Sequence, residues 1–146
     1  MPPSELELEP GEELRATAHV SFRGAAGATA RSTFALGSAR MRHRIYEDWR
    51  HAVEQAGFPT AGPEMILAVT NQRLLACTKT FWMGRLAHVD DAIPLTQIAD
   101  VGVERHGIVV ALVFAMANGQ LVEVETMRGR RLRRFAEAVR AALPQR

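Results

Sequence analysis

The segment Ile108–Met127 reads IVVALVFAMANGQLVEVETM and places two runs of strand-forming residues on either side of Asn118-Gly119. An Asn-Gly pair tolerates the positive φ angles of a type I′ turn, so this segment predicts a β-hairpin. In the second run, Val122 and Val124 alternate with two glutamates, which is typical of a strand with one buried and one solvated face. The hairpin therefore predicts antiparallel sheet in this half of the chain.

Similar short runs recur upstream of the hairpin, separated by turn-forming residues. Together they predict strands at Leu14–Phe22, Met65–Thr70, Arg73–Thr80, Arg85–Val89, Ile98–Glu104, Ile108–Met116 and Gln120–Met127. The pair Asp90-Asp91, which precedes Pro94, is expected to form a turn. Short connections between consecutive strands predict an antiparallel meander.

Two other segments have the spacing of amphipathic helices. In Ser38–Ala56, apolar residues recur every three or four positions and Gly57 supplies a stop signal. In the segment from Arg130 to Leu143, an apolar stripe ends before Pro144; its members are Leu132, Phe135, Ala136, Val139 and Leu143.

A meander cannot bury its inner face alone, so we expect the terminal helix to close it. The predicted fold is α+β and mainly β. It is an antiparallel partial barrel capped by a C-terminal helix, with an extra helix at about residues 38–56 inserted after the first strand.

The 146 residues are enough for one domain with a core, and 47% hydrophobic content is typical of a globular chain. The net charge of +2 conceals a strong segregation: −5 over residues 1–13, +5 over 14–50, −4 over 51–125 and +6 over 126–146. We interpret residues 1–13 as an acidic flexible arm and residues 14–146 as a single domain. The small net charge argues against obligate electrostatic wrapping of nucleic acid.

The N-terminal residues and the single cysteine predict a cytoplasmic protein. The acidic start lacks the positive n-region of a secretory signal, and the longest apolar run, Ile108–Ala117, has ten residues. About 18–20 are needed to cross a bilayer. Cys77 lies in an apolar run without a partner cysteine, which favours a buried thiol over a nucleophile.

Several pieces of the chain occur in an order that resembles a known family. They are Met65–Ala76, with Thr70-Asn71-Gln72-Arg73-Leu74 between two strands, then Ile93–Val101, the Asn118-Gly119 hairpin and the helix that contains Phe135. Over roughly residues 60–143 the chain resembles bacterial pleckstrin-homology-like (PH-like) domains related to GRAM domains. The resemblance implies two nearly orthogonal antiparallel sheets capped at one end by the C-terminal helix. The helix expected at 38–56 is a departure from a minimal domain of this family.

The basic tail supplies the first candidate site. Five arginines fall within seven residues, and guanidinium groups bind phosphate bidentately. The structural alternative is that they only solvate a helix in an arginine-rich chain, although cations near a helix N-terminus slightly oppose the helix dipole. The candidate contacts for an anion or lipid headgroup are Lys79, Arg85, Arg128, Arg130, Arg133 and Arg134.

A second candidate is a hairpin tip at Phe81, Trp82 and Met83, between Lys79 and Arg85. Such a tip is suited to a membrane interface, to an interface with a protein partner or a second copy, or to packing against the core.

Metal and catalytic sites are not predicted. His43, Glu47 and His51 have ligand-compatible spacing, but pairing between neighbours four residues apart on a helix explains it without a metal. Asp90 and Asp91 are adjacent in extended chain and point to opposite sides, so they do not form an acid and base pair. We therefore expect no cofactor and no enzyme activity.

These patterns leave three functional hypotheses. The first is a non-enzymatic binding module for protein association or self-assembly, acting through a strand edge and the Phe81–Met83 tip. The second is peripheral binding of anionic lipid or phosphate-bearing ligands by the Arg-rich C-terminal region, at the inner face of the membrane. The weakest is nucleic-acid binding, because the chain has no recognition-helix motif and no row of stacking aromatic residues.

Overall fold

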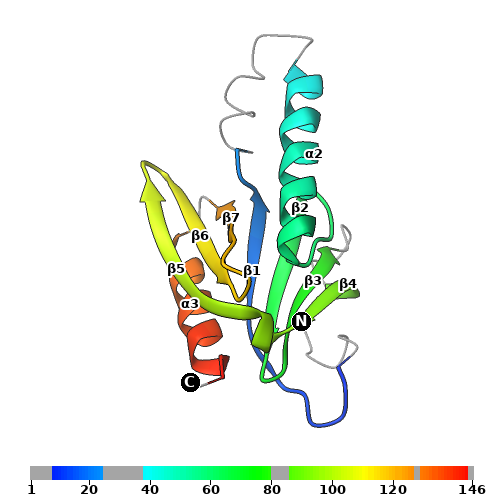
Figure 1. Cartoon of the computed structure of the whole chain (residues 1–146), viewed down its shortest axis with the longest axis vertical. Coiled ribbons are helices and arrows are strands. Elements are labelled where there is room, and N and C mark those ends of the chain that lie inside the picture. Colours follow the sequence, from blue (N-terminus) through cyan, green and yellow to red (C-terminus); the bar gives the residue numbers. More distant parts are fainter. Residues whose placement is uncertain (1–7, 25–37, 80–85, 127–128, 145–146) are drawn as a thin grey trace.

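The computed structural model describes residues 8–24, 38–79, 86–126 and 129–144. Within them it contains seven strands, two α-helices and one 3-10 turn (Figure 1). The elements are β1 (Leu14–Phe22), α2 (Ser38–Ala56), β2 (Glu64–Thr70), β3 (Arg73–Lys79), β4 (Leu86–Pro94), η2 (Leu95–Gln97), β5 (Ile98–His106), β6 (Val109–Met116), β7 (Leu121–Thr126) and α3 (Gly129–Ala142). The predicted α+β, mainly β class is confirmed.

The strands form one antiparallel sheet in the order β4-β3-β2-β1-β7-β6-β5. Strand β1 joins two meanders: it pairs with β2 from Leu14 to Ser21, but only Ser21 and Phe22 pair with β7. Figure 1 shows the sheet splayed and bent around this junction. The arrangement is consistent with a partial barrel, and β4 and β5, although consecutive in sequence, lie at opposite ends of the strand order.

The prediction of a turn at Asp90-Asp91 is wrong. Strand β4 continues to Pro94, and Ala76 pairs with Asp91 while Cys77 pairs with Val89, so Asp90 is the extra residue of a β-bulge. Bulges and charged side chains are common devices on a strand at the end of a sheet. Two adjacent acids are therefore compatible with an edge bulge as well as with a turn.

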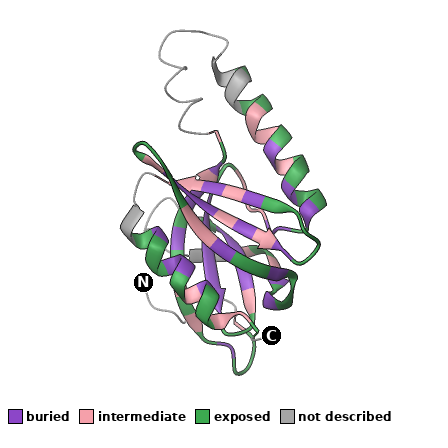
Figure 2. Ribbon diagram, turned by 60° about the vertical axis from the view of Figure 1, so that its left-hand side comes forward, coloured by how far each residue is buried: buried purple, intermediate pink, exposed green. Residues whose placement is uncertain are grey.

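Helix α3 closes the sheet as expected. It packs against β1, β2, β5 and β6, and its buried stripe consists of Leu132, Phe135, Ala136 and Val139. Figure 2 shows this buried stripe facing the strands while the opposite side of α3 is exposed. Phe22, Leu112, Phe114 and Val124 belong to the same core cluster.

Helix α2 packs over the junction of β1 and β7. The Trp49 indole Nε1–H donates to the Glu123 carbonyl of β7 at 2.8 Å, and the Trp49 ring contacts those of Phe22 and Tyr46. In Figure 1, α2 lies near β1 and β2, away from α3, which lies beside β5 and β6, and residues of both helices belong to the same core cluster. The inserted helix therefore leaves the β5–α3 side of the molecule uncovered.

Gly24 allows α2 to approach the end of β1. Its φ is +95°, and a Cβ there would lie 2.9 Å from Ile45 Cγ2 of α2. We expect Gly24→Ala to lower the free energy of unfolding by about 1–3 kcal/mol, because backbone strain and a clash combine. Urea denaturation measures this, with Gly107→Ala as the matched control. Gly107 has a φ of +67° and open space around it, so only strain of about 1 kcal/mol is expected. Equal losses in the two variants would argue against the close approach of α2.

The part of the predicted flexible arm that the structure describes, residues 8–13, is held against the β2–β3 turn. Asn71 accepts a hydrogen bond from the Glu13 amide at 2.7 Å and donates to the Gly11 carbonyl at 3.1 Å. Leu8 packs on the outer face of β2 and β3. Residues of the segment predicted to be a flexible arm thus contact the domain at the β2–β3 turn.

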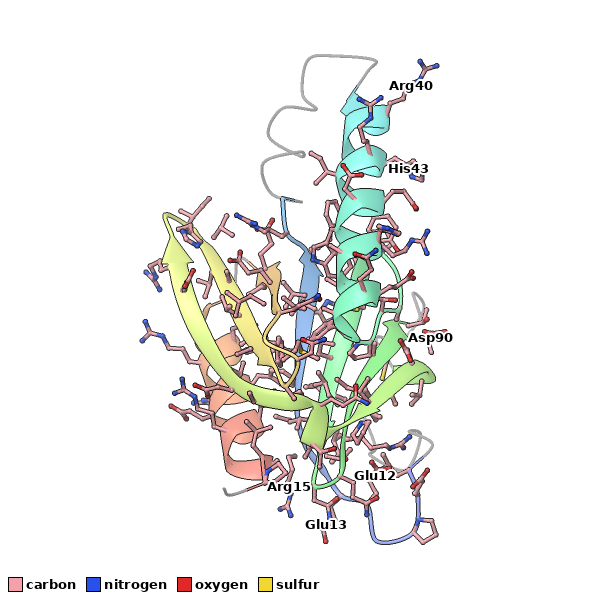
Figure 3. All side chains as sticks on the ribbon, in the orientation of Figure 1. Glu12, Glu13, Arg15, Arg40, His43 and Asp90 are labelled. Carbon is pink, nitrogen blue, oxygen red and sulfur yellow. The ribbon has the colours of Figure 1, made fainter. Side chains whose placement is uncertain are left out.

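Glu12 is the centre of this contact (Figure 3). Its side chain is fully buried and accepts hydrogen bonds from Arg73 Nε at 2.9 Å, from Arg73 Nη2 at 2.7 Å and from the Thr70 hydroxyl at 2.7 Å. The Thr70 hydroxyl also accepts the Gln72 and Arg73 amides and so fixes the turn. The Thr-Asn-x-Arg sequence of the β2–β3 turn thus anchors the chain that leads into β1.

The outer face of β2 and β3 carries a second apolar cluster of Ile66, Ala68, Leu75 and Cys77. Cys77 is a free, buried thiol, as expected, and burial raises its pKa to about 11. Because the thiol stays protonated at neutral pH, it behaves as a packing residue.

Candidate anion-binding groove between α3 and β5

The structure places only some of the predicted site residues. Phe81, Trp82, Met83, Arg85 and Arg128 lie outside the described residues, as does the tip that the first three were expected to form. Lys79 ends β3 and Arg130 lies in the first turn of α3, and the side chains of both also lie outside the described parts. Arg133 and Arg134 are exposed on α3.

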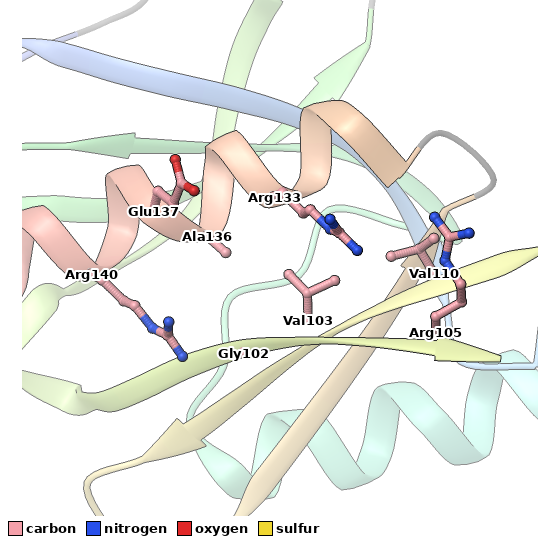
Figure 4. Close-up of a pocket in the computed structure, with 8 residues that line it drawn as sticks. All are labelled: Gly102, Val103, Arg105, Val110, Arg133, Ala136, Glu137 and Arg140. Atoms are coloured by element: carbon pink, nitrogen blue, oxygen red, sulfur yellow. The ribbon is translucent and has the colours of Figure 1, made fainter.

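Arg133 borders a groove of about 380 Å³ between α3 and β5 (Figure 4). The groove is lined by Gly102, Val103, Arg105, Val110, Arg133, Ala136, Glu137 and Arg140. Its polar side chains are thus three arginines and one glutamate, on a floor of small and branched apolar residues. We call this feature the basic groove.

Local periodicity explains why these residues meet. Arg133, Glu137 and Arg140 are four and then three residues apart, so they share one face of α3. Val103 and Arg105 are two residues apart on β5 and share one face of the strand. Ala136 and Gly102, which face each other across the groove in Figure 4, are small enough to leave it open.

The charged side chains of the groove point in different directions. In Figure 4, Arg133 and Arg140 extend from α3 toward β5, whereas the Glu137 carboxylate is directed away from the strand. Arg140 Nε lies 3.3 Å from Asp100 Oδ1, but both side chains are more than half exposed, so solvent weakens this pair. The groove therefore presents an excess of guanidinium groups to an incoming ligand.

Strand β5 provides a second feature of the groove, an edge. Within the described part of the chain, β5 pairs only with β6 and ends the strand order. The Val101 amide donates to Asp100 Oδ1, a side chain of its own strand, at 2.8 Å. Backbone groups of consecutive residues face opposite edges of a strand, so Val103 and Arg105, two and four residues after Val101, turn their amides and carbonyls toward the same edge as Val101.

The lining of the basic groove overlaps only in part with the predicted anion contacts. Arg133 was anticipated, but Arg134 is one residue away on the helix, about 100° around its axis, and does not line the groove. Arg105 and Arg140 were missed. Arg140 could have been predicted from the sequence, because it follows Arg133 by two helical turns. The position of Arg105 in the groove depends on how β5 packs beside α3, which the sequence pattern does not show.

The other candidate clusters remain separate from the groove. Lys79 lies on β3, toward the opposite end of the strand order from β5. On α2, Glu47 accepts a hydrogen bond from Arg50 at 2.8 Å, and the His51 ring lies 3.1 Å from the Gln55 side-chain amide. His43 lies nearer the N-terminal end of the same helix in Figure 3. Among the described residues, no three His, Cys, Asp or Glu side chains are grouped to hold a metal.

Comparison with known proteins adds no family: no protein-family model matches this chain, and neither does any curated protein. None of the helices in the described residues combines the length and the apolar character needed to span a membrane.

Proposed function

We propose that this chain is a non-enzymatic binding module of the PH-like class that associates with another protein or with a second copy of itself. The observation that supports the proposal is the edge of β5, which lies beside the basic groove and pairs with no described strand on that side. Exposed strand edges and adjacent grooves are common recognition surfaces for protein segments.

The arrangement of strands supports the PH-like part of the proposal. Strands β2–β4 and β5–β7 form two meanders that share β1, and the narrow two-residue pairing of β1 with β7 allows them to turn toward a near-orthogonal arrangement. The C-terminal helix α3 covers the core between these halves. We propose a cytoplasmic location for this module.

The lining of the basic groove supports binding rather than catalysis. Among the described residues, this lining contains guanidinium groups and one carboxylate but no hydroxyl, thiol or imidazole. Nucleophilic and general acid–base catalysis most often use one of these missing groups, although a carboxylate can also serve. The module needs no cofactor for the proposed role.

A second candidate function is peripheral binding of anionic lipid or another phosphate-bearing ligand. It is favoured by the exposed positions of Arg131, Arg133 and Arg134 along α3, which extend the positive surface beyond the groove. Under this alternative the chain would lie at the inner face of the membrane, and an anionic surface would attract these side chains.

The proposal is tested by placing a photo-crosslinking amino acid at Glu104, which is exposed on β5, and at Gln55, which is exposed on α2, as the control. We expect a discrete protein adduct from position 104 in an extract of the source cells, and none from position 55. Mass spectrometry of the adduct distinguishes a second copy from another protein. Absence of a protein adduct at position 104, together with sedimentation on vesicles that contain anionic lipid, would replace the proposal by the lipid alternative.

A further inference from the structure

We infer that the basic groove binds an extended, acidic segment of a partner protein, which adds to β5 as an extra strand. This inference deepens the proposed function and rests on it. The proposed function requires only that a protein binds at the β5 edge. The inference specifies the conformation and the charge pattern of the segment that binds.

The backbone of β5 supports the extended conformation. Val101, Val103 and Arg105 turn their amides and carbonyls toward the edge that pairs with no described strand, and the Val101 amide is already partnered by Asp100 Oδ1. An incoming strand aligned with Val103 and Arg105 would hydrogen-bond backbone groups that pair with no strand among the described residues. The groove runs beside this edge, so the segment would lie between β5 and α3.

The arginines support the acidic composition. Arg133 and Arg140 are seven residues apart on α3, which corresponds to about 10 Å along the helix axis. In an extended segment, residues at alternate positions face the same side and are about 6.6 Å apart. Two or three acidic residues at alternate positions would therefore face α3 and reach Arg133, Arg140 and, at the end of β5, Arg105.

The shape of the groove favours a protein segment over a single phosphate group. A phosphate engages one or two guanidinium groups at one point, whereas these arginines are spread along two turns of α3. Val103, Val110 and Ala136 form an apolar floor that suits the aliphatic part of glutamate side chains. Glu137 also lines the groove, but its carboxylate is directed away from β5 and so leaves the arginines free to face the segment.

The test is a fluorescence anisotropy titration of the full chain with a labelled synthetic heptapeptide, Glu-Thr-Glu-Val-Glu-Thr-Glu, in which acids alternate with strand-forming residues. We expect saturable binding that weakens with added salt. Arg133→Glu and Arg140→Glu should each weaken it about tenfold, because each places a like charge against the probe. Arg134→Glu makes the same change of charge outside the groove and should alter the affinity by no more than about twofold.

Two altered probes separate charge from strand addition. Replacing the four glutamates by glutamine should remove most of the affinity, and N-methylation of alternate backbone amides should weaken binding about tenfold by removing strand hydrogen bonds. These probes leave the protein unchanged, so they remain informative if a groove variant fails to fold.

Three results would overturn the inference: no saturable binding of the heptapeptide, equal weakening by Arg134→Glu and Arg133→Glu, or equal binding of the N-methylated probe. In the first of these cases, vesicle binding that depends on Arg133 and Arg140 would favour the lipid alternative. If the heptapeptide fails while a protein adduct still forms at position 104, the inference fails and the proposed function stands. If both fail, the proposed function fails as well.

Discussion

Replacing Phe135 by Ala is expected to lower the free energy of unfolding by about 3–5 kcal/mol, the range for large-to-small substitutions of core aromatic residues. The Phe135 side chain is fully buried in the core between α3 and the sheet. Its loss would leave a cavity where α3 closes the two meanders, and the surrounding strands are hydrogen-bonded too extensively to collapse into it. Urea denaturation monitored by circular dichroism measures the effect.

The matched control is Arg131→Ala, which alters an exposed residue of the same helix. A change within about 0.5 kcal/mol is expected there, because no buried contact is removed. A loss below about 1 kcal/mol for Phe135→Ala would contradict the role of α3 as the element that closes the sheet.

The Glu12 carboxylate is expected to produce the second large effect, a loss of stability in acid. Hydrogen bonds from Arg73 lower the pKa of Glu12 from 4.5 to about 2, against the opposing effect of burial. Because the folded state holds this proton less tightly than the unfolded state, the stabilisation is fully present above about pH 4.5 and is lost as the pH falls toward 2. A shift of this size corresponds to about 3 kcal/mol.

The variant Glu12→Gln isolates this contribution. At pH 7 it should be less stable than the wild type by about 3 kcal/mol, because Arg73 loses its charged partner. The difference should shrink as the pH is lowered from 5 to 2.5, as measured by urea denaturation at each pH. Glu47→Gln is the control, since Glu47 also has a lowered pKa but forms an exposed pair with Arg50, which contributes little to stability. A difference that persists unchanged at pH 2.5 would contradict the assigned pairing.

The periodicity of the sequence was sufficient to predict most of the elements. Helix α2 has the predicted bounds, and α3 differs by one residue at each end. The buried stripe of α3 was also predictable, because residues three and four apart share a helix face whatever the helix packs against. The prediction of a turn at Asp90-Asp91 was wrong because the local sequence does not distinguish a turn from a bulge on an edge strand.

The candidate site was predictable only in part. The arginine-rich start of α3 includes Arg133, which lines the groove, and Arg134, which does not, and the prediction omitted Arg140, which also lines it. Lys79 belongs to the other meander, whereas Arg85 and the tip at Phe81–Met83 lie outside the described residues.

The sequence by itself determined the mainly β composition, the two amphipathic helices and the faces that each element buries. These depend on interactions within a few residues, which a local pattern records. Only the tertiary structure decided that Glu12 would meet Arg73 across 61 residues, and that Arg105 of β5 would join Arg133 and Arg140 of α3. Such contacts depend on how β1 joins the two meanders and on where α3 lies across them. That arrangement is fixed by burial of the shared core, to which residues from the whole chain contribute.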